Sequence, residues 1–185
     1  LLIKDNHIDY INKNDVELDN NLCVMLSTSG STGSPKLVKL SKKNIISNAH
    51  SIIDFLEINS NHKTITTLPF NYSYGLSVIN SHFTVGAAII LNSYNVLKKE
   101  FWNKIRINKV NSFSGVPYLY KILKKINFST YEIDSILYLS QAGGKLDNQT
   151  IEYFLHDSKV KNYKFIVMYG QTEATARISY LPYKN

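Results

Sequence analysis

The chain is poor in the residues that several common classes of protein require. It has a single cysteine, Cys23, so no disulfide can form within it. Cys23 lies in the apolar run 22–26, and we interpret it as a buried strand residue. A catalytic thiol is the alternative, but no cationic side chain stands nearby in the sequence to activate it. The longest other apolar run, Val85 to Leu91, is far short of the roughly 18 residues that cross a bilayer. We therefore expect a cytoplasmic protein without a membrane span.

Arginine is scarce as well. The net charge of +7 and the pI near 9.3 suggest a nucleic-acid partner, but only Arg106 and Arg177 among the 21 basic residues are arginine. Base and phosphate readers depend on the bidentate guanidinium of arginine. A basic nucleic-acid-binding domain is thus a weak alternative, and we expect no nucleic-acid partner. The histidines show no metal-ligand or triad spacing: His7, His50, His62, His82 and His156.

The length of 185 residues and the 44% hydrophobic content fit one domain with a real core. The chain starts at Leu1, without an initiator Met or the pattern of a signal peptide, so we expect that processing or truncation removed an earlier segment. Residues 1–21 are polar and read as a lead-in or linker. Residues 22–185 read as one domain.

Strand-like and helix-like segments alternate along that domain, which predicts an α/β fold with parallel strands and crossover helices. The clearest helix is capped by Ser41 and runs to about Glu57, because its apolar residues recur on one face. The run 22–26 predicts a strand buried on both faces. Further strands are expected at 38–40, 64–68, 87–91, 112–114, 135–140 and 163–168, and further helices at 76–84, 98–107, 117–125 and 148–155.

The segment Thr28–Lys36 has the composition of a phosphate-binding loop. It consists of Ser, Thr and Gly followed by Pro35 and Lys36. Glycines allow close backbone approach to a phosphate, hydroxyl and N–H groups donate to its oxygens, and a lysine adds positive charge. It is not a Walker A motif, because Ser34 and Pro35 separate the last glycine from the lysine. A flexible Ser/Gly linker remains the alternative.

This segment resembles the signature loop T-S-G-S-T-G-x-P-K-G of the adenylate-forming superfamily, which includes acyl-CoA synthetases, luciferases and peptide-synthetase adenylation domains. Nine consecutive positions match, and Leu37 replaces the final glycine. Two more motifs follow in the expected order. The segment 68–76 resembles L-P-x-x-H-x-x-G, with Tyr72 in place of the histidine, and 169–173 resembles Y-G-x-T-E.

Two shorter segments also resemble the family. Residues 142–146 are similar to G-G-A-P-L, with Lys145 in place of the proline, and 115–118 are similar to G-V-P-x. Taken without the resemblance, each is a loop that enters a helix, and Pro117 suits a first helical position. The amino-acid sequence of the motifs is most similar to that of bacterial acyl-CoA-synthetase-like proteins. The resemblance covers residues 22 to 182. It implies that the chain is part of the large N-terminal domain of an adenylate-forming enzyme.

The resemblance implies a reaction in which ATP activates a carboxylic acid as acyl-AMP and pyrophosphate leaves. The acyl group then passes to a thiol, either that of coenzyme A or that of the phosphopantetheine arm of an acyl or peptidyl carrier protein. Such a reaction needs no general base, because a carboxylate is already ionised at pH 7. By the same resemblance Glu173 holds Mg²⁺, Tyr169 stacks on adenine, Thr172 binds the α-phosphate and Lys36 the outer phosphates. The implied catalytic residues are Lys36, Thr172 and Glu173. The implied nucleotide-binding residues are Thr28, Ser29, Gly30, Ser31, Thr32, Gly33, Lys36, Gly143, Gly144, Met168, Tyr169, Gly170, Gln171 and Thr172. The implied acyl-pocket residues are Tyr72, Tyr74, Val116, Tyr118 and Gly143.

The family's ribose-binding Asp motif and its C-terminal domain with a catalytic Lys are absent from the sequence. We therefore expect the 185 residues alone to lack turnover. A non-catalytic nucleotide-binding remnant is the alternative function.

Overall fold

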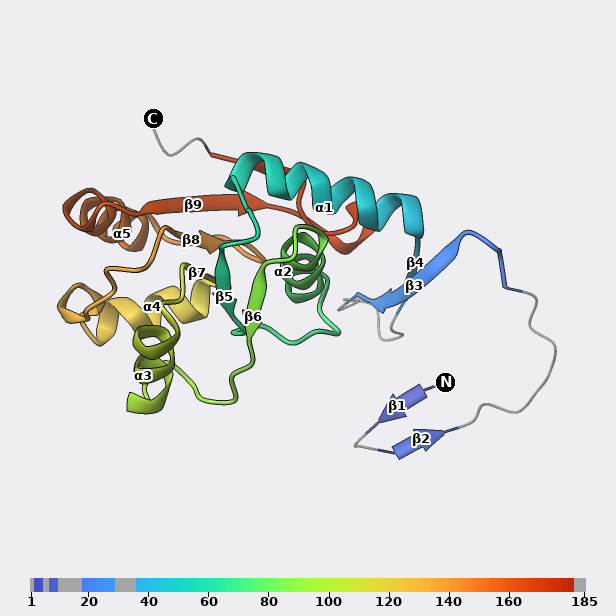
Figure 1. The fold of residues 1–185 in the computed structure, drawn as a ribbon. Coiled ribbons are helices and arrows are strands. Elements are labelled where there is room, and N and C mark those ends of the chain that lie inside the picture. The colour runs from blue at the N-terminus through green and yellow to red at the C-terminus, as the bar shows by residue number, and fades with distance from the viewer. Residues whose placement is uncertain (1, 5–6, 10–17, 29–35, 182–185) are drawn as a thin grey trace.

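The computed structural model describes residues 2–4, 7–9, 18–28 and 36–181, and its elements alternate as the sequence predicts (Figure 1). The strands are β1 Leu2–Lys4, β2 His7–Asp9, β3 Leu22–Ser27, β4 Leu37–Ser41, β5 Lys63–Ile65, β6 Ala88–Ile90, β7 Ser112–Gly115, β8 Tyr138–Gln141, β9 Lys164–Tyr169 and β10 Ser179–Tyr180. The helices are α1 Lys42–Leu56, α2 Ser73–Thr84, α3 Lys99–Asn108, α4 Pro117–Lys125 and α5 Asn148–Lys161, with short 3₁₀ turns η1 Phe128–Thr130 and η2 Thr172–Ala174.

The main sheet has six strands in the order β10-β9-β8-β7-β5-β6. The pairs from β9 to β6 are parallel, and β10 joins β9 antiparallel at one edge. From β5 the chain goes outward to β6 and then returns to build β7, β8 and β9 on the other side. The direction of winding therefore reverses between β5 and β7, which is the place where open α/β sheets commonly bind ligands.

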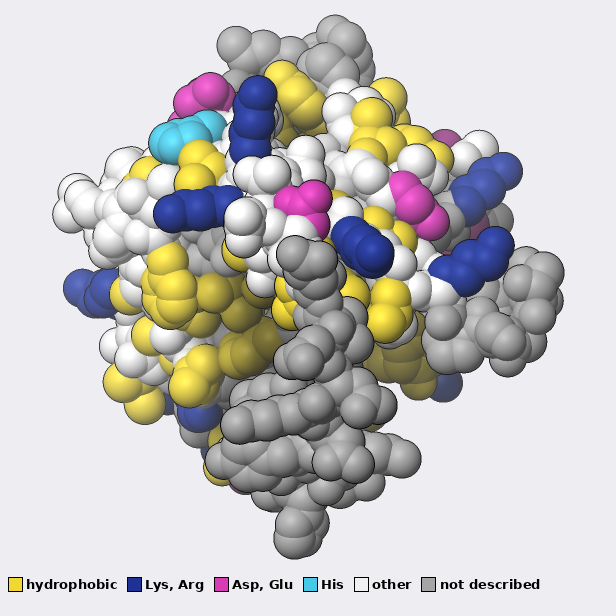
Figure 2. All heavy atoms as spheres, turned by 90° about the vertical axis from the view of Figure 1, so that its right-hand side faces the viewer, with side chains coloured by type: hydrophobic (Ala, Val, Ile, Leu, Met, Phe, Trp, Pro, Cys, Tyr) yellow, Lys and Arg dark blue, Asp and Glu magenta, His cyan; other side chains and the backbone are white. Residues whose placement is uncertain are grey.

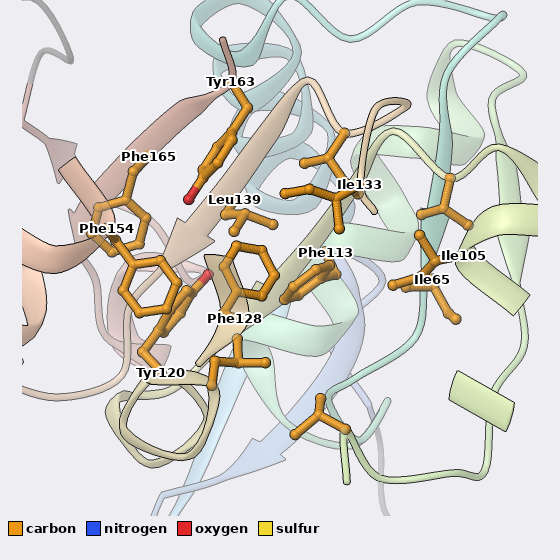
Figure 3. Close-up of a cluster of buried hydrophobic side chains, with 14 of the residues drawn as sticks. Ile65, Ile105, Phe113, Tyr120, Phe128, Ile133, Leu139, Phe154, Tyr163 and Phe165 are labelled. Atoms are coloured by element: carbon orange, nitrogen blue, oxygen red, sulfur yellow. The ribbon is translucent and has the colours of Figure 1, made fainter. Parts of the chain in front are cut away.

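Helices cover both faces of this sheet, because alternate strand residues face opposite layers (Figure 1). Leu139 and Phe165 belong to one apolar cluster with residues of α3, α4 and α5. Their neighbours Tyr138 and Ile166 belong to a second cluster with residues of α1 and α2. In the first cluster aromatic rings surround Phe128, whose ring lies 5.5 Å from that of Phe154 (Figure 3). The α/β prediction is confirmed.

Helix α1 begins where the sequence predicts. The Ser41 hydroxyl accepts a hydrogen bond from the backbone N–H of Asn44 at 3.1 Å, and the Asn44 side chain accepts one from the backbone N–H of Ser41 at 3.0 Å. This reciprocal pair is a capping box. The helix ends before Glu57, which adopts a left-handed conformation with φ of 55°.

The first long strand departs from the prediction. Strand β3 pairs with β4 in a separate antiparallel sheet, and the exposure of its residues alternates rather than being low throughout. The expectation of a strand buried on both faces is therefore wrong. Cys23 is exposed, so its interpretation as a buried residue is also wrong. A two-stranded sheet with one covered face leaves every second side chain in solvent.

Several boundaries also differ. Helix α2 starts at Ser73, three residues before the predicted 76, and α5 continues to Lys161 rather than 155. Strand β8 starts only at Tyr138, because residues 133–136 form a turn closed by the backbone N–H of Ile136 on the carbonyl of Ile133. Strands β1, β2 and β10 were not expected. Within the described residues, no helix combines the length and the apolar character needed to traverse a bilayer.

Candidate functional site

The motif segments meet at the carboxyl edge of the parallel sheet. The segment 115–117 follows β7, residues 142–146 follow β8, and residues 170–174 follow β9. The segment 66–72 follows β5, and the Thr67 hydroxyl donates a hydrogen bond to the carbonyl of Ser114 at the end of β7. Segments far apart in the sequence thus reach the same edge, because all their strands run in one direction.

A cavity of about 480 Å³ joins two of these segments. It is lined by Gly143, Gly144 and Lys145 on one side and by Met168, Tyr169 and Gly170 on the other. Tyr169 is 60% exposed, so its ring is available to a ligand, whereas Met168 is buried. The cavity therefore has a glycine backbone on one wall and an exposed aromatic ring on another, which suits a flat, partly apolar molecule.

The turn after β9 is fixed by close backbone packing. A Cβ at Gly170 would collide with the carbonyl oxygen of Ala176. The backbone N–H of Ile178 donates to the carbonyl of Tyr169 at 2.9 Å, closing the loop that carries η2. Only glycine fits at position 170, and the loop holds Thr172 and Glu173 close to Tyr169.

Thr172 is tied to the start of α2. Its hydroxyl donates a hydrogen bond to the Ser73 hydroxyl at 3.1 Å. One helical turn further, Ser77 accepts a hydrogen bond from Nε of Arg177 at 3.2 Å. Two serines on one face of α2 therefore hold both ends of the segment 172–177 against the helix.

Arg177 itself is buried, with its guanidinium 5.0 Å from the centre of the Tyr74 ring and Nη1 3.8 Å from the sulfur of Met168. Burial lowers the pKa of Arg177 below its usual value, and no ion pair engages it within the described part of the chain. No local pattern in the sequence indicates the positioning roles of Ser73 and Arg177. The scarcity of arginine was the one signal that singled out Arg177.

The ends of the predicted phosphate loop lie beside this turn. The backbone N–H of Thr28 donates to the carbonyl of Lys36 at 3.0 Å, which closes the base of the loop. Strand β4, which follows Lys36, contacts η2. Ser29, Gly30, Ser31, Thr32 and Gly33 lie outside the described residues. The two ends of the loop are therefore brought to the same place as Thr172 and Glu173.

Three of the five predicted acyl-pocket residues meet. A Cβ at Gly143, which has φ of +80°, would contact the Tyr72 hydroxyl and Val116. Tyr72 follows β5 and Val116 follows β7, so the group lies at the reversal point of the sheet. Partial burial raises the pKa of Tyr72, so its hydroxyl is neutral at pH 7.

The other two are placed elsewhere. Tyr74 is buried in the core, and its hydroxyl donates to the carbonyl of Ser140 at 2.9 Å. Tyr118 is 73% exposed on α4. Neither is among the residues that line the cavity of Gly143 and Tyr169.

A larger cavity, of about 610 Å³, lies at the opposite edge of the sheet, between the start of β8 and β9 and the end of α1. It contains none of the predicted site residues. Size alone does not identify the site, because the motifs and the carboxyl ends of the strands are on the other side.

Figure 2 views the molecule from the side toward which β8 and β9 point. There the visible Lys and Arg side chains are separated by uncharged and acidic ones (Figure 2). No group of three or more His, Cys, Asp or Glu side chains arranged to hold a metal occurs in the residues described.

Together the parallel sheet, the loops at its carboxyl edge and the cavity between them define an α/β ligand-binding protein. The chain belongs to the family of AMP-binding enzymes, whose model matches residues 4–184.

Similar proteins agree with this assignment. The chain is 27% identical to a putative acyl-CoA synthetase, YngI, from Bacillus subtilis (strain 168), over 90% of the chain and 30% of that protein. Among solved structures it is similar to o-succinylbenzoate coenzyme A synthetase (MenE) from Bacillus subtilis in complex with ATP and magnesium ion, with a TM-score of 0.72 at 22% identity over 86% of this chain and 32% of that one. It is also similar to McyG A-PCP complexed with phenylalanyl-adenylate, with a TM-score of 0.75 at 19% identity over 91% and 29%. The chain thus spans about a third of the length of such relatives, and it has the fold of the N-terminal domain of adenylate-forming enzymes.

Proposed function

We propose that the protein activates a carboxylic acid with ATP, forming an acyl-AMP and pyrophosphate, and then transfers the acyl group to a thiol of coenzyme A or of a carrier protein. The observation that carries this proposal is the cavity shared by Gly143–Gly144 and Tyr169–Gly170, with Thr172 and the base of the Thr28–Lys36 loop beside it. The similarity to enzymes solved with ATP and magnesium ion or with an acyl-adenylate supports it.

In this proposal the base occupies the cavity and lies against the Tyr169 ring. The Thr172 hydroxyl binds the α-phosphate, its side chain oriented by Ser73. Lys36 and the loop that it closes bind the outer phosphates. These groups bring a negatively charged phosphate chain close to a second anion, the substrate carboxylate, by supplying donors and positive charge.

Glu173 fits the role of a magnesium ligand. Its side chain is exposed, and no hydrogen bond or ion pair to another described residue occupies it. Mg²⁺ in nucleotide sites usually takes one or two carboxylates and completes its shell with phosphate oxygens and water. When bound, the ion would neutralise charge on the phosphates. Only Glu173 is proposed as its ligand here.

The bond changes are simple. A carboxylate oxygen bonds to the α-phosphorus while the bond from that phosphorus to the bridging oxygen of the β-phosphate breaks, and pyrophosphate leaves with the electron pair. No proton moves, which agrees with a site that has no histidine among the residues lining the cavity. The acyl group would lie near Tyr72 and Val116, at the reversal point of the sheet.

The test is carboxylate-dependent exchange of labelled pyrophosphate into ATP, measured on the whole protein with Mg²⁺ and a panel of aliphatic, aromatic and amino acids. We expect exchange with at least one acid and its loss in Lys36→Met. Lys39→Met, an equally exposed change on β4 three residues further on, should leave the rate unchanged. Nucleotide binding without exchange for any acid would instead identify a non-catalytic nucleotide-binding protein.

A further inference from the structure

Gln141 is the last residue of β8, and its side chain is completely buried at the edge of the candidate cavity. In the sheet it stands between Gly115 of β7 and Val167 of β9. Neither of these neighbours carries a polar side chain. A buried carboxamide between a glycine and a valine is an unusual choice for a strand end, because buried polar groups need hydrogen-bond partners.

One half of the Gln141 carboxamide is satisfied. Its Nε2 donates a hydrogen bond to the carbonyl of Gly144 at 2.9 Å. A carbonyl can only accept, so this bond fixes which end of the amide faces Gly144. The other end, Oε1, is buried and has no hydrogen-bond donor.

The place of Gln141 in the wall of the candidate cavity points to a ligand as the missing donor. Gln141 lines the same cavity as Gly143, Gly144 and Tyr169, which the proposed function assigns to the base of ATP. Adenine carries an exocyclic amino group, which donates hydrogen bonds. Hypoxanthine and guanine carry a carbonyl oxygen at that position, which cannot donate.

We infer that Gln141 selects adenine among the purine bases by accepting a hydrogen bond from its exocyclic amino group. This inference rests on the proposed function. It assigns base specificity to a side chain on β8, whereas the motifs after β9 supply the stacking ring and the phosphate contacts.

The contact requires a small movement of the neighbouring loop. Oε1 has almost no exposed surface, so we expect the amino group to reach it after a shift of the Gly143–Gly144 segment, whose Gly144 carbonyl the same amide contacts. Both glycines have positive φ values, +80° and +159°, and a glycine backbone changes such values at little steric cost. The Gly144 carbonyl held by Nε2 moves with the amide, so base binding and loop position are coupled through Gln141.

The experiment measures equilibrium binding of three nucleotides, each with Mg²⁺, to the whole protein by calorimetry: ATP, ITP, and the triphosphate of purine riboside, which has hydrogen in place of the amino group. We expect wild type to bind ATP about tenfold more tightly than purine riboside triphosphate, as for the loss of one buried hydrogen bond, and to bind ITP more weakly still. In Gln141→Met, a substitution of similar length, ATP and purine riboside triphosphate should bind equally. Gln149→Met, the same change on the exposed start of α5, should keep the wild-type preference.

Each other outcome has a definite meaning. If wild type binds ATP and purine riboside triphosphate equally, the inference is wrong whether or not Gln141→Met folds. If wild type prefers ATP and folded Gln141→Met keeps that preference, Gln141 is not the selecting residue and the proposed function stands. If wild type binds none of the nucleotides, the proposed function fails and the inference fails with it.

Discussion

The hydroxyl of Thr172 lies 3.1 Å from that of Ser73, across 99 positions of sequence. The bond joins the turn after β9 to the first residue of α2, and so links the Y-G-x-T-E segment to the L-P-x-x-H-x-x-G segment. The two motifs are therefore parts of one structural unit, and a substitution in either should alter the position of the other.

Removing the Ser73 hydroxyl should weaken nucleotide binding although, in our proposal, Ser73 touches no ligand. Ser73→Ala takes away the acceptor that orients Thr172, a loss of about 1 kcal/mol or roughly fivefold in ATP affinity. Thr172→Val should cost more, and the double substitution should add little to it, because the two act through one bond. Ser51→Ala, at an exposed position of α1, should leave ATP affinity unchanged. If calorimetry shows that the losses in ATP-binding free energy of the two single variants simply add up in the double variant, the coupling is contradicted.

The Tyr169 ring should contribute by stacking rather than through its hydroxyl. Tyr169→Phe should bind ATP like wild type, while Tyr169→Ala should lose about 1–3 kcal/mol, roughly tenfold to a hundredfold. Tyr94→Ala, at a half-exposed tyrosine that follows β6 and does not line this cavity, is the matched control. Equal ATP affinity of Tyr169→Ala and wild type would show that the base does not bind in this cavity.

A methyl group at Gly170 should displace the turn that carries Thr172. Gly170→Ala forces the new Cβ against the Ala176 carbonyl, and we expect a loss of about 1–3 kcal/mol in unfolding free energy together with weaker ATP binding. Gly86→Ala is the control, because its φ of +72° also disfavours alanine but no atom lies within 4 Å of the new Cβ. That variant should lose stability and keep its affinity. Unchanged ATP affinity in Gly170→Ala would show that the turn can shift freely.

Stability should fall in mild acid because of His82. Burial lowers the pKa of this residue from 6.5 to about 4, with the hydrogen bond from its ring to the Val78 carbonyl acting in the opposite direction. Between these two values the unfolded chain binds a proton that the folded chain does not, so stability is complete above pH 6.5 and decreases as the pH falls toward 4. The decrease is roughly 3 kcal/mol.

Urea unfolding at a series of pH values measures this effect. The slope between pH 6.5 and 4 should become shallower in His82→Gln, which cannot titrate, and should stay as in wild type in His50→Gln, because His50 is exposed. A slope unaffected by His82→Gln would assign the acid sensitivity to other groups.

The sequence by itself determined the alternation of strands and helices, the N-terminal cap of α1 and the order of the motifs. Each of these depends on neighbouring residues: apolar periodicity, the local reach of Ser41 to Asn44, and consecutive letters in a motif. Local patterns also suggested, through the resemblance, that Tyr169, Thr172 and Lys36 belong to one site.

Only the tertiary structure decided which of these segments meet and which side chains face them. The apolar run around Cys23 does not reveal that β3 has a single strand partner and leaves that cysteine in solvent. The nominated Tyr72 and Tyr74 are two positions apart, yet one lies against Gly143 and the other is bonded inside the core. Strand order and helix placement produce the unpaired Oε1 of Gln141 and the hydrogen bond from Thr172 to Ser73. Packing brings together residues that no local pattern connects.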